Sequence, residues 1–534
     1  MSEIAQVEIV FLLLLLFVIV FGILARRLGT PYPIVMVIGG LLIGLIPGMP
    51  GITLNPDLVF LVVLPPLLFA AAWTTSWRDF RYNLVSISLL AFGLVGFTVL
   101  AVALLAPSFL YGFDWRLGFV LGAVIAPTDA IAATSIARRV GLPHRVVDIL
   151  EGESLINDAT GLLALQFAID LVVNKQAPTV ANGILILAWL TGGGIALGLL
   201  LGWIVDFIER RIDDGPIEIA LSILVPYAAY LAADKIHASG VLAVVACGLF
   251  LSRRSVTFFS PSVRLQVWSV WESLNFVLNG LVFVLIGLQL PAIRNSIQGY
   301  GLSQLVMDGV VFSALVILLR LVWTYPGAGI AWLIRTRIGC QKEKAPRLRS
   351  IFVLGWTGMR GVVSLAAALA LPTLLSDGSS FPQRNVIIFL TFCVIFVTLV
   401  LQGVTLPPLI RALGLAGGAG PNCEEQEARR IVTEAAVSHL EGAKQRDSEQ
   451  SAAIYDDLVR HYRQRLASLQ PRDESQEDAA EHDLHIGLSL EALRVERETA
   501  IRLRDEGRIN DEVLRRIERE LDLSESGAVV EGEA

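Results

Sequence analysis

The chain has 534 residues, of which 54% are hydrophobic and only 17% are charged. A soluble protein of this length would not have this composition, whereas a polytopic helical membrane protein would. The net charge of −7 is unevenly shared, since residues 1–420 carry +5 and residues 421–534 carry −12. A tail with this acidic surplus is not expected to bind nucleic acid or anionic lipid.

The cysteines indicate free thiols, and the first apolar run indicates a membrane span that is retained. Four cysteines are scattered without metal-ligand or disulfide spacing, so we expect free thiols; they are Cys247, Cys340, Cys393 and Cys423. The first apolar run is long, lacks a basic segment before it and is followed by Arg26 and Arg27. This pattern is typical of a retained first span rather than a cleaved signal peptide.

Thirteen apolar segments are long enough, or nearly so, to cross a hydrocarbon core of about 30 Å as helices. They cover approximately residues 7–26, 32–48, 57–75, 83–107, 115–137, 146–173, 183–208, 217–234, 238–252, 268–290, 304–333, 350–371 and 385–413. Nineteen Lys and Arg residues follow the odd segments and only five follow the even ones. The positive-inside rule therefore places the N-terminus outside and the tail in the cytoplasm.

The fifth segment contains a polar interruption at Ala126-Pro127-Thr128-Asp129-Ala130. Proline in the middle of a helix removes one backbone donor and frees carbonyl groups. In a bilayer such broken backbone survives only where protein or a cavity satisfies it. Freed carbonyls beside a carboxylate are suited to a small desolvated cation, so we expect a broken helix with an ion site here.

The sixth segment carries the polar run Glu151–Asp158. Read as one helix, it places Glu153 over Asn157 and Ser154 over Asp158, because residues four apart share a face. Carboxylates at mid-membrane depth are costly unless they face a watery cavity or a partner. The sequence therefore predicts an ion or proton pathway along this face.

The eleventh and twelfth segments place positive charge at the same depth. Arg320 lies in the middle of the eleventh, and Arg360 lies within the glycine-rich stretch Gly355–Ser364 of the twelfth. Three glycines around a mid-span arginine predict a second interrupted helix. Segments four to six and eleven to thirteen thus each contain a broken middle helix, which is the pattern of an inverted-repeat transporter with its site at the midplane.

Three motifs resemble the signature of the NhaP/NHE-type cation/proton antiporters, in this order along the chain: Pro127-Thr128-Asp129, Glu153-Ser154-Leu155-Ile156-Asn157-Asp158 and Gly358-Met359-Arg360-Gly361. A looser resemblance at Ser239–Gly248 and Asn279–Gln289 extends it over most of residues 1–415. The resemblance implies an all-α polytopic membrane protein of about 13 transmembrane helices with inverted repeats and two broken crossing helices. It also implies a homodimer in the plasma (inner) membrane.

The resemblance also implies a division of the chain. Residues 1–413 would form the antiporter domain. Its mobile transport core would comprise about 83–173 and 304–413, and its dimer scaffold about 7–75 and 183–290. A glycine-rich linker would follow at 414–421. The remaining residues, 422–534, have helical periodicity and are expected to form a cytoplasmic helical tail that regulates transport or braces the dimer.

Carried over residue by residue, the resemblance makes Asp158 the main ion and proton carrier. Asp129, Ser154 and the backbone or side chain of Thr128 would complete the cation site, and Asn157 would support it. The chemistry agrees, because Na⁺ prefers oxygen ligands. A carboxylate in a low-dielectric crevice can bind either Na⁺ or H⁺, since desolvation disfavours its bare charged form.

The resemblance gives the remaining charged residues supporting roles. Glu153 would contact the cation through water at most, because an ion pair with Arg320 would hold it as a structural clamp. Arg360 would offset the exposed carbonyl groups at the helix ends where the two broken helices cross.

The resemblance implies a secondary active transporter, not an enzyme, that exchanges Na⁺ or Li⁺ for H⁺ for sodium extrusion and pH homeostasis. No cofactor is expected beyond the transported ions. A K⁺/H⁺ antiporter of the same family is the alternative, since oxygen ligands alone do not fix the cavity size. A cation channel or sensor built on the same site is a further alternative, distinguished by its failure to move protons against a cation gradient.

Overall fold

The computed structural model describes residues 3–46, 54–173, 180–297, 301–337, 345–375, 378–416, 423–446, 452–468, 476–506, 508, 513–514, 517–518 and 520–525. The chain divides into two compact units, Met1–Gly418 and Ala419–Ala534. Cys247 and Cys393 are free thiols in the first unit, whereas Cys340 lies outside the described residues.

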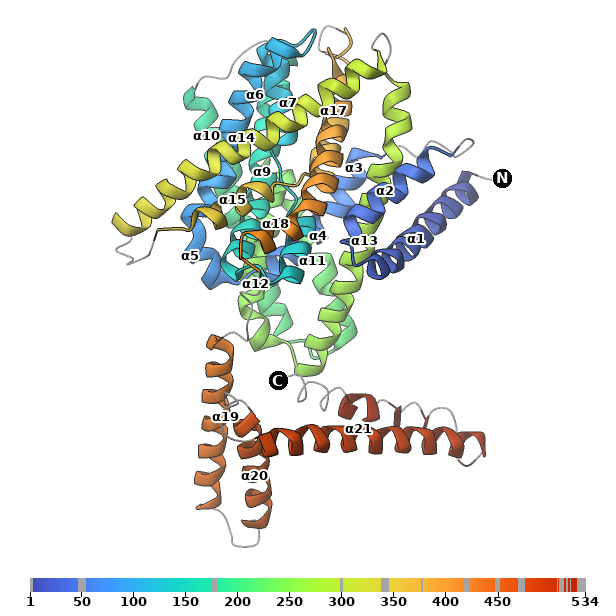
Figure 1. Ribbon diagram of the computed structural model, residues 1–534, viewed down its shortest axis with the longest axis vertical. Coiled ribbons are helices and arrows are strands. Elements are labelled where there is room, and N and C mark those ends of the chain that lie inside the picture. Colours follow the sequence, from blue (N-terminus) through green and yellow to red (C-terminus); the bar gives the residue numbers. More distant parts are fainter. Residues whose placement is uncertain are drawn as a thin grey trace. The chain divides into compact units, whose positions relative to one another are not determined.

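The first unit is built from helices (Figure 1). They are α1 (Glu3–Leu28), α2 (Tyr32–Gly44), α3 (Pro56–Leu58), α4 (Leu64–Thr74), α5 (Trp77–Ser88), α6 (Val95–Phe109), α7 (Trp115–Ile125), α8 (Ala130–Val140), α9 (His144–Val173), α10 (Val180–Glu209), α11 (Gly215–Lys235), α12 (Gly240–Phe258), α13 (Pro261–Asn295), α14 (Leu302–Arg337), α15 (Leu348–Trp356), α16 (Val362–Leu369), α17 (Arg384–Val397) and α18 (Gly403–Ala412). Three π-helical stretches join consecutive helices, namely η1 (Val59–Val63), η2 (Leu89–Leu94) and η3 (Thr398–Gln402).

Each of the thirteen apolar segments of the sequence coincides with a helix or with consecutive helices. Among the described residues, nine helices are long and apolar enough to cross a membrane, or ten when the bent pair α7–α8 is counted as one span. The all-helical membrane fold is therefore confirmed. The count of thirteen spans, the inverted repeats and the side on which each terminus lies stay predictions.

Both predicted interruptions are present. α7 ends at Ile125 and α8 begins at Ala130, with a bend of 44° between them. α15 ends at Trp356 and α16 begins at Val362. At the end of the short α16, Arg384 donates to the last helical carbonyl, Leu369 O, at 2.7 Å, and to Leu371 O just beyond the helix at 2.9 Å. These breaks leave two stretches of non-helical backbone, and both are buried in protein.

Small residues let the helices approach closely. A Cβ atom at Gly40 of α2 would lie 2.3 Å from Val284 O of α13, and one at Gly287 of α13 would lie 2.3 Å from Val37 O of α2. The same pattern joins α10 to α12, where a Cβ at Gly198 would lie 2.2 Å from Ala243 O. Helices in a membrane associate through such close van der Waals packing, because lipid removes the hydrophobic driving force between them.

The second unit contains α19 (Cys423–Lys444), α20 (Ala452–Ser468) and α21 (Gln476–Asp505). α19 and α20 are joined by ion pairs of Lys444 with Asp456 and of Arg463 with Glu441, the second at 2.6 Å. Both pairs are largely exposed and contribute little by themselves.

The close approach of α2 and α13 generates a stability prediction. Gly287→Leu should destabilise the protein by about 1–3 kcal/mol or more, because the added side chain overlaps the backbone of α2. The measurement is the thermal unfolding midpoint of purified protein in detergent. Gly329→Leu in α14, where a Cβ meets no atom within 4 Å, is the matched control; equal midpoints for both variants would contradict the packing.

Candidate functional site

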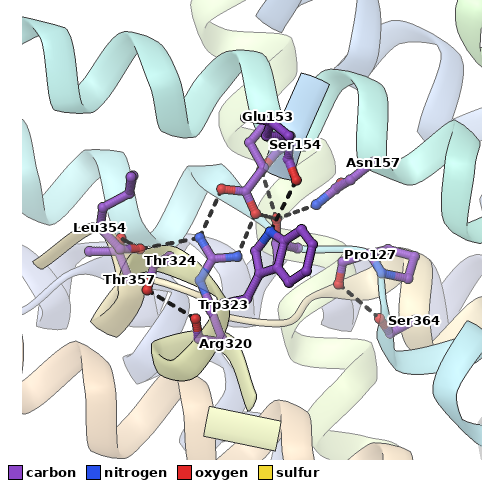
Figure 2. A network of polar contacts seen from close by, with 12 residues as sticks. Pro127, Glu153, Ser154, Asn157, Arg320, Trp323, Thr324, Leu354, Thr357 and Ser364 are labelled. Carbon is purple, nitrogen blue, oxygen red and sulfur yellow. Dashed lines mark hydrogen bonds and ion pairs between the residues drawn. The ribbon is translucent and has the colours of Figure 1, made fainter. Parts of the chain in front are cut away.

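The polar face of α9 points into the protein rather than toward lipid. Glu153, Asn157 and Asp158 are 0%, 1% and 7% exposed. They share a face with Ser154 because residues four apart in a helix lie above one another. In Figure 2 the Glu153, Ser154 and Asn157 side chains converge on one region from α9. A charged helix face without access to solvent needs partners, and other helices supply them.

The hydroxyl of Thr128, in the break between α7 and α8, connects this face. Asn157 donates from Nδ2 to Thr128 Oγ1 at 2.5 Å, and Thr128 Oγ1 donates to Glu153 Oε1 at 3.2 Å. Ser154 Oγ lies 3.3 Å from Thr128 Oγ1. Since the single Thr128 proton goes to Glu153, Ser154 is the donor in that contact. The Thr128 hydroxyl thus accepts from Asn157 and Ser154 and donates to Glu153. The main-chain carbonyl is therefore the oxygen that Thr128 can offer to a cation.

A buried ion pair joins α9 to α14. Arg320 binds Glu153 through both carboxylate oxygens, with Nη2 at 2.8 Å from Oε2 and Nη1 on Oε1. The two side chains are 2% and 1% exposed. Arg320 also donates to Leu354 O of α15 at 3.3 Å. Bidentate geometry of this kind fixes orientation as well as charge, so α9, α14 and α15 are held together at one point (Figure 2).

The two interrupted helices meet at their breaks, a region called the crossover below, and bond to each other there. Asp129 N donates to Met359 O at 2.9 Å, and Ser364 Oγ donates to Pro127 O at 3.4 Å. Asp129 also caps α8, since its Oδ1 accepts from Ile131 N at 2.8 Å. On the other side, Arg360 N donates to Thr398 Oγ1 at 3.1 Å. Each break therefore supplies part of what the other break leaves unsatisfied.

Asp158 interacts electrostatically with two other charged side chains at the crossover. Asp158 lies within electrostatic reach of Asp129 and of Arg360. Among the described residues, Asp158 Oδ1 and Asn157 Oδ1 have no hydrogen-bond partner, and neither have Nε and Nη1 of Arg360. A buried carboxylate oxygen without a partner is unusual and marks a place where a proton or cation can be received.

The structure thus brings the sequence-predicted residues together in two ways. Thr128, Glu153, Ser154, Asn157 and Arg320 form one network of direct contacts. Asp129, Asp158 and Arg360 join it through the crossover backbone and through electrostatics.

The structure also contains a cavity of about 530 Å³, which the sequence does not predict. Its wall comes from α1, α2, α4 and α13, and from Arg139 at the end of α8. Tyr32 lines the cavity and is also within electrostatic reach of Asp129. The sequence does not mark the cavity-lining residues Tyr32, Glu272 and Asn275 as functional. A tyrosine after a short loop and polar residues near the end of a span are ordinary in membrane proteins.

Comparison with known proteins gives this arrangement a family. The profile of the family described as "Sodium/hydrogen exchanger, transmembrane" matches residues 12–412. An uncharacterized Na⁺/H⁺ exchanger of Mycobacterium tuberculosis is 34% identical over 521 residues, covering 95% of this chain and 94% of that protein. The Na⁺/H⁺ antiporter ApNhaP of Aphanothece halophytica is 33% identical, covering 77% of this chain and 75% of that protein.

A further relative and a solved structure also match the chain. A sodium, potassium, lithium and rubidium/H⁺ antiporter of Bacillus pumilus is 34% identical, covering 82% of this chain and 66% of that protein. The solved structure of the sodium proton antiporter MjNhaP1 from Methanocaldococcus jannaschii matches with a TM-score of 0.58 at 20% identity, covering 77% of this chain and 99% of that one. That structure supports the fold. The matches across residues 12–412 and to relatives that span nearly the whole chain show that this protein belongs to the sodium/hydrogen exchanger family of multi-pass membrane antiporters, which are secondary transporters and not enzymes.

Proposed function

We propose that this chain exchanges Na⁺ or Li⁺ for H⁺ across the plasma membrane, with Asp158 as the seat for which the cation and the proton compete. The N-terminus faces outside, the acidic tail lies in the cytoplasm as a regulatory or dimer-bracing element, and the working unit is a homodimer. Sodium extrusion and pH homeostasis are the physiological result.

The observation that carries this proposal is the Asp158 carboxylate. It is 7% exposed, its Oδ1 has no hydrogen-bond partner in the described part of the chain, and it lies within electrostatic reach of Asp129. Such a group must gain either a proton or a cation to be stable at that depth. Carboxylate, amide, hydroxyl and main-chain oxygens nearby are the ligands that a hard monovalent cation prefers.

Glu153 is supported as a clamp rather than a carrier. Its two oxygens are committed to Arg320, and Oε1 also accepts from Thr128. A carboxylate with all of these donors has little capacity left for a transported cation. Its role is to hold α9, α14 and the break between α7 and α8 at a fixed spacing around Asp158.

The 530 Å³ cavity supports exchange by alternating access. Its wall combines helices assigned to the scaffold (α1, α2, α4 and α13) with Arg139, which belongs to the transport core. Alternating access requires the boundary between core and scaffold to open on one side of the membrane at a time. Arg26 and Arg139 at this cavity belong to predicted cytoplasmic loops, so the opening faces the cytoplasm.

Potassium is the second candidate substrate. The Bacillus pumilus relative is named for sodium, potassium, lithium and rubidium. Because cavity size and ligand flexibility decide between such ions, a site of carboxylate and carbonyl oxygens is compatible with more than one of them.

The first prediction concerns the carrier. Asp158→Asn should abolish cation-dependent proton flux, because the amide cannot exchange a proton for a cation, while the protein still inserts and purifies as a folded species. Proton flux in proteoliposomes under imposed Na⁺, Li⁺ and K⁺ gradients is the measurement. Asp170→Asn, on the exposed side of the same helix, should exchange normally. Full flux through the Asp158→Asn variant would refute the assignment.

The second prediction concerns the clamp. Glu153→Ala should destabilise the protein by about 3–5 kcal/mol, because it leaves a buried guanidinium uncompensated. The double variant Glu153→Gln with Arg320→Met should recover much of that loss, since it removes both charges and keeps an acceptor for Thr128. Thermal unfolding in detergent compares them. A Glu153→Ala protein as stable as the unsubstituted one, yet inactive, would shift Glu153 to a direct role in transport.

The third prediction concerns the cavity. In a background with the four cysteines replaced by serine, a cysteine at Thr74, which lines the cavity, should react with a membrane-impermeant cationic thiol reagent from the cytoplasmic side. Exchange should then fall, because the attached charge occupies the access route. A cysteine at Leu104, which is 74% exposed on α6, should stay unreactive in lipid. Reaction at Thr74→Cys from the outside alone would overturn the inward-facing assignment.

A further inference from the structure

Gly361, directly before α16, lies against the Asp129 carboxyl group. A Cβ atom at Gly361 would be 2.2 Å from Asp129 Oδ2 and 2.7 Å from Asp129 Cβ and Cγ. Its backbone is extended, with φ −138° and ψ −152°, so it does not adopt the positive φ that favours glycine. Glycine is therefore not needed here for the backbone, and the structural reason for its presence is the space taken by the carboxylate.

The Asp129 carboxyl group has little freedom to yield. Its Oδ1 accepts from Ile131 N at 2.8 Å at the start of α8, and the main chain of Asp129 donates to Met359 O at 2.9 Å. The residue is thus held from α8 on one side and from the stretch before α16 on the other. Any atom added at Gly361 must move the carboxylate, the crossover backbone, or both.

We propose that Gly361 is a specificity-determining residue of the exchanger, because its bare α-carbon sets the position of the second carboxylate of the cation site. This inference rests on the proposed function, in which Asp129 contributes to cation binding. The ligand class is a monovalent alkali cation. Discrimination among such cations depends on cavity size and ligand placement. A carboxylate displaced by a methyl group therefore alters the preference among Li⁺, Na⁺ and K⁺ as well as the affinity.

A neighbouring glycine in the same stretch separates this role from general packing. A Cβ at Gly358 would lie 2.1 Å from Arg320 Cδ, so Gly358 accommodates the ion-pair clamp while Gly361 accommodates the carboxylate. The same substitution at the two positions consequently has different results. Gly358→Ala lowers stability without changing the preference among cations, whereas Gly361→Ala changes that preference.

The test measures exchange in proteoliposomes for Li⁺, Na⁺ and K⁺ with full-length protein. Gly361→Ala should raise the apparent KM for Na⁺ by about fivefold or more and change the ratio of the Li⁺ and K⁺ KM values by about threefold or more. Gly329→Ala, at a position where a Cβ meets no atom within 4 Å, should change neither. A ratio unchanged in Gly361→Ala would overturn the inference.

A second measurement decides the matter if Gly361→Ala folds poorly. Asp129→Ser removes Oδ2 but keeps a side-chain oxygen that can cap α8. Serine keeps the Cβ atom of residue 129 but lacks Oδ2, the atom nearest to the added methyl group. If the methyl group acts through the carboxylate, Gly361→Ala should lower the thermal midpoint less in the Asp129→Ser background than in the unsubstituted protein. Equal losses in the two backgrounds would overturn the inference.

Failure of the proposed function and failure of the inference about Gly361 give different results in these experiments. An unsubstituted protein without cation-dependent proton flux would overturn the proposed function and this inference with it. Flux that is present, lost in Asp158→Asn and unchanged in ion preference by Gly361→Ala would overturn the inference alone.

Discussion

The buried contact between Glu153 and Arg320 is the interaction on which the rest of the site depends. It joins α9 to α14 at a point where neither charge reaches solvent, and Arg320 extends it to Leu354 O of α15. Through Thr128 the same carboxylate is tied to the break between α7 and α8. Four separate segments therefore take their spacing from one pair of charges. Removing either charge would leave the other in a place where it cannot be hydrated.

The crossover of the two interrupted helices solves a problem that the membrane imposes. Broken helices expose main-chain groups that lipid cannot satisfy. Here each break bonds to the other, through Asp129 N to Met359 O and through Ser364 to Pro127 O. The charges also offset one another, because the Arg360 guanidinium is within electrostatic reach of both the Glu153 and the Asp158 carboxylates. The result is a buried site in which Asp158 Oδ1 has no hydrogen-bond partner among the described residues.

Much of this arrangement could be predicted from the sequence, because it depends on residues that are close together in the chain. A proline or a charge inside an apolar span is also energetically costly unless the fold accommodates it. A proline next to Thr128 and Asp129 inside an apolar run predicts a broken helix, and α7 and α8 are broken there. The spacing of Glu153, Asn157 and Asp158 predicts one shared face, which follows from helical geometry alone. The partnership of Glu153 with Arg320 came from family resemblance, since nothing local connects residues 167 positions apart.

Other features could not be predicted, because they depend on how distant helices pack. The cavity is lined by residues from five helices, and nothing in the order of the chain indicates that Tyr32 comes within electrostatic reach of Asp129. The use of the Thr128 hydroxyl as a connector depends on side-chain geometry that periodicity does not contain. The seating of Gly361 against a carboxylate is similarly invisible in a stretch where glycine also fits a simple interruption.

The capping bond of Asp129 has a thermodynamic consequence for the proposed cation site. Because Oδ1 is already fixed to the first turn of α8, the side chain occupies one rotamer before any cation arrives. If Asp129 is a cation ligand, as proposed above, binding costs little side-chain ordering entropy at this residue, where a freely rotating group would lose about 0.5–1.5 kcal/mol. Under the same proposal, a carboxylate already held in place would also release its ion without having to relax, which suits a carrier that loads and unloads in every cycle.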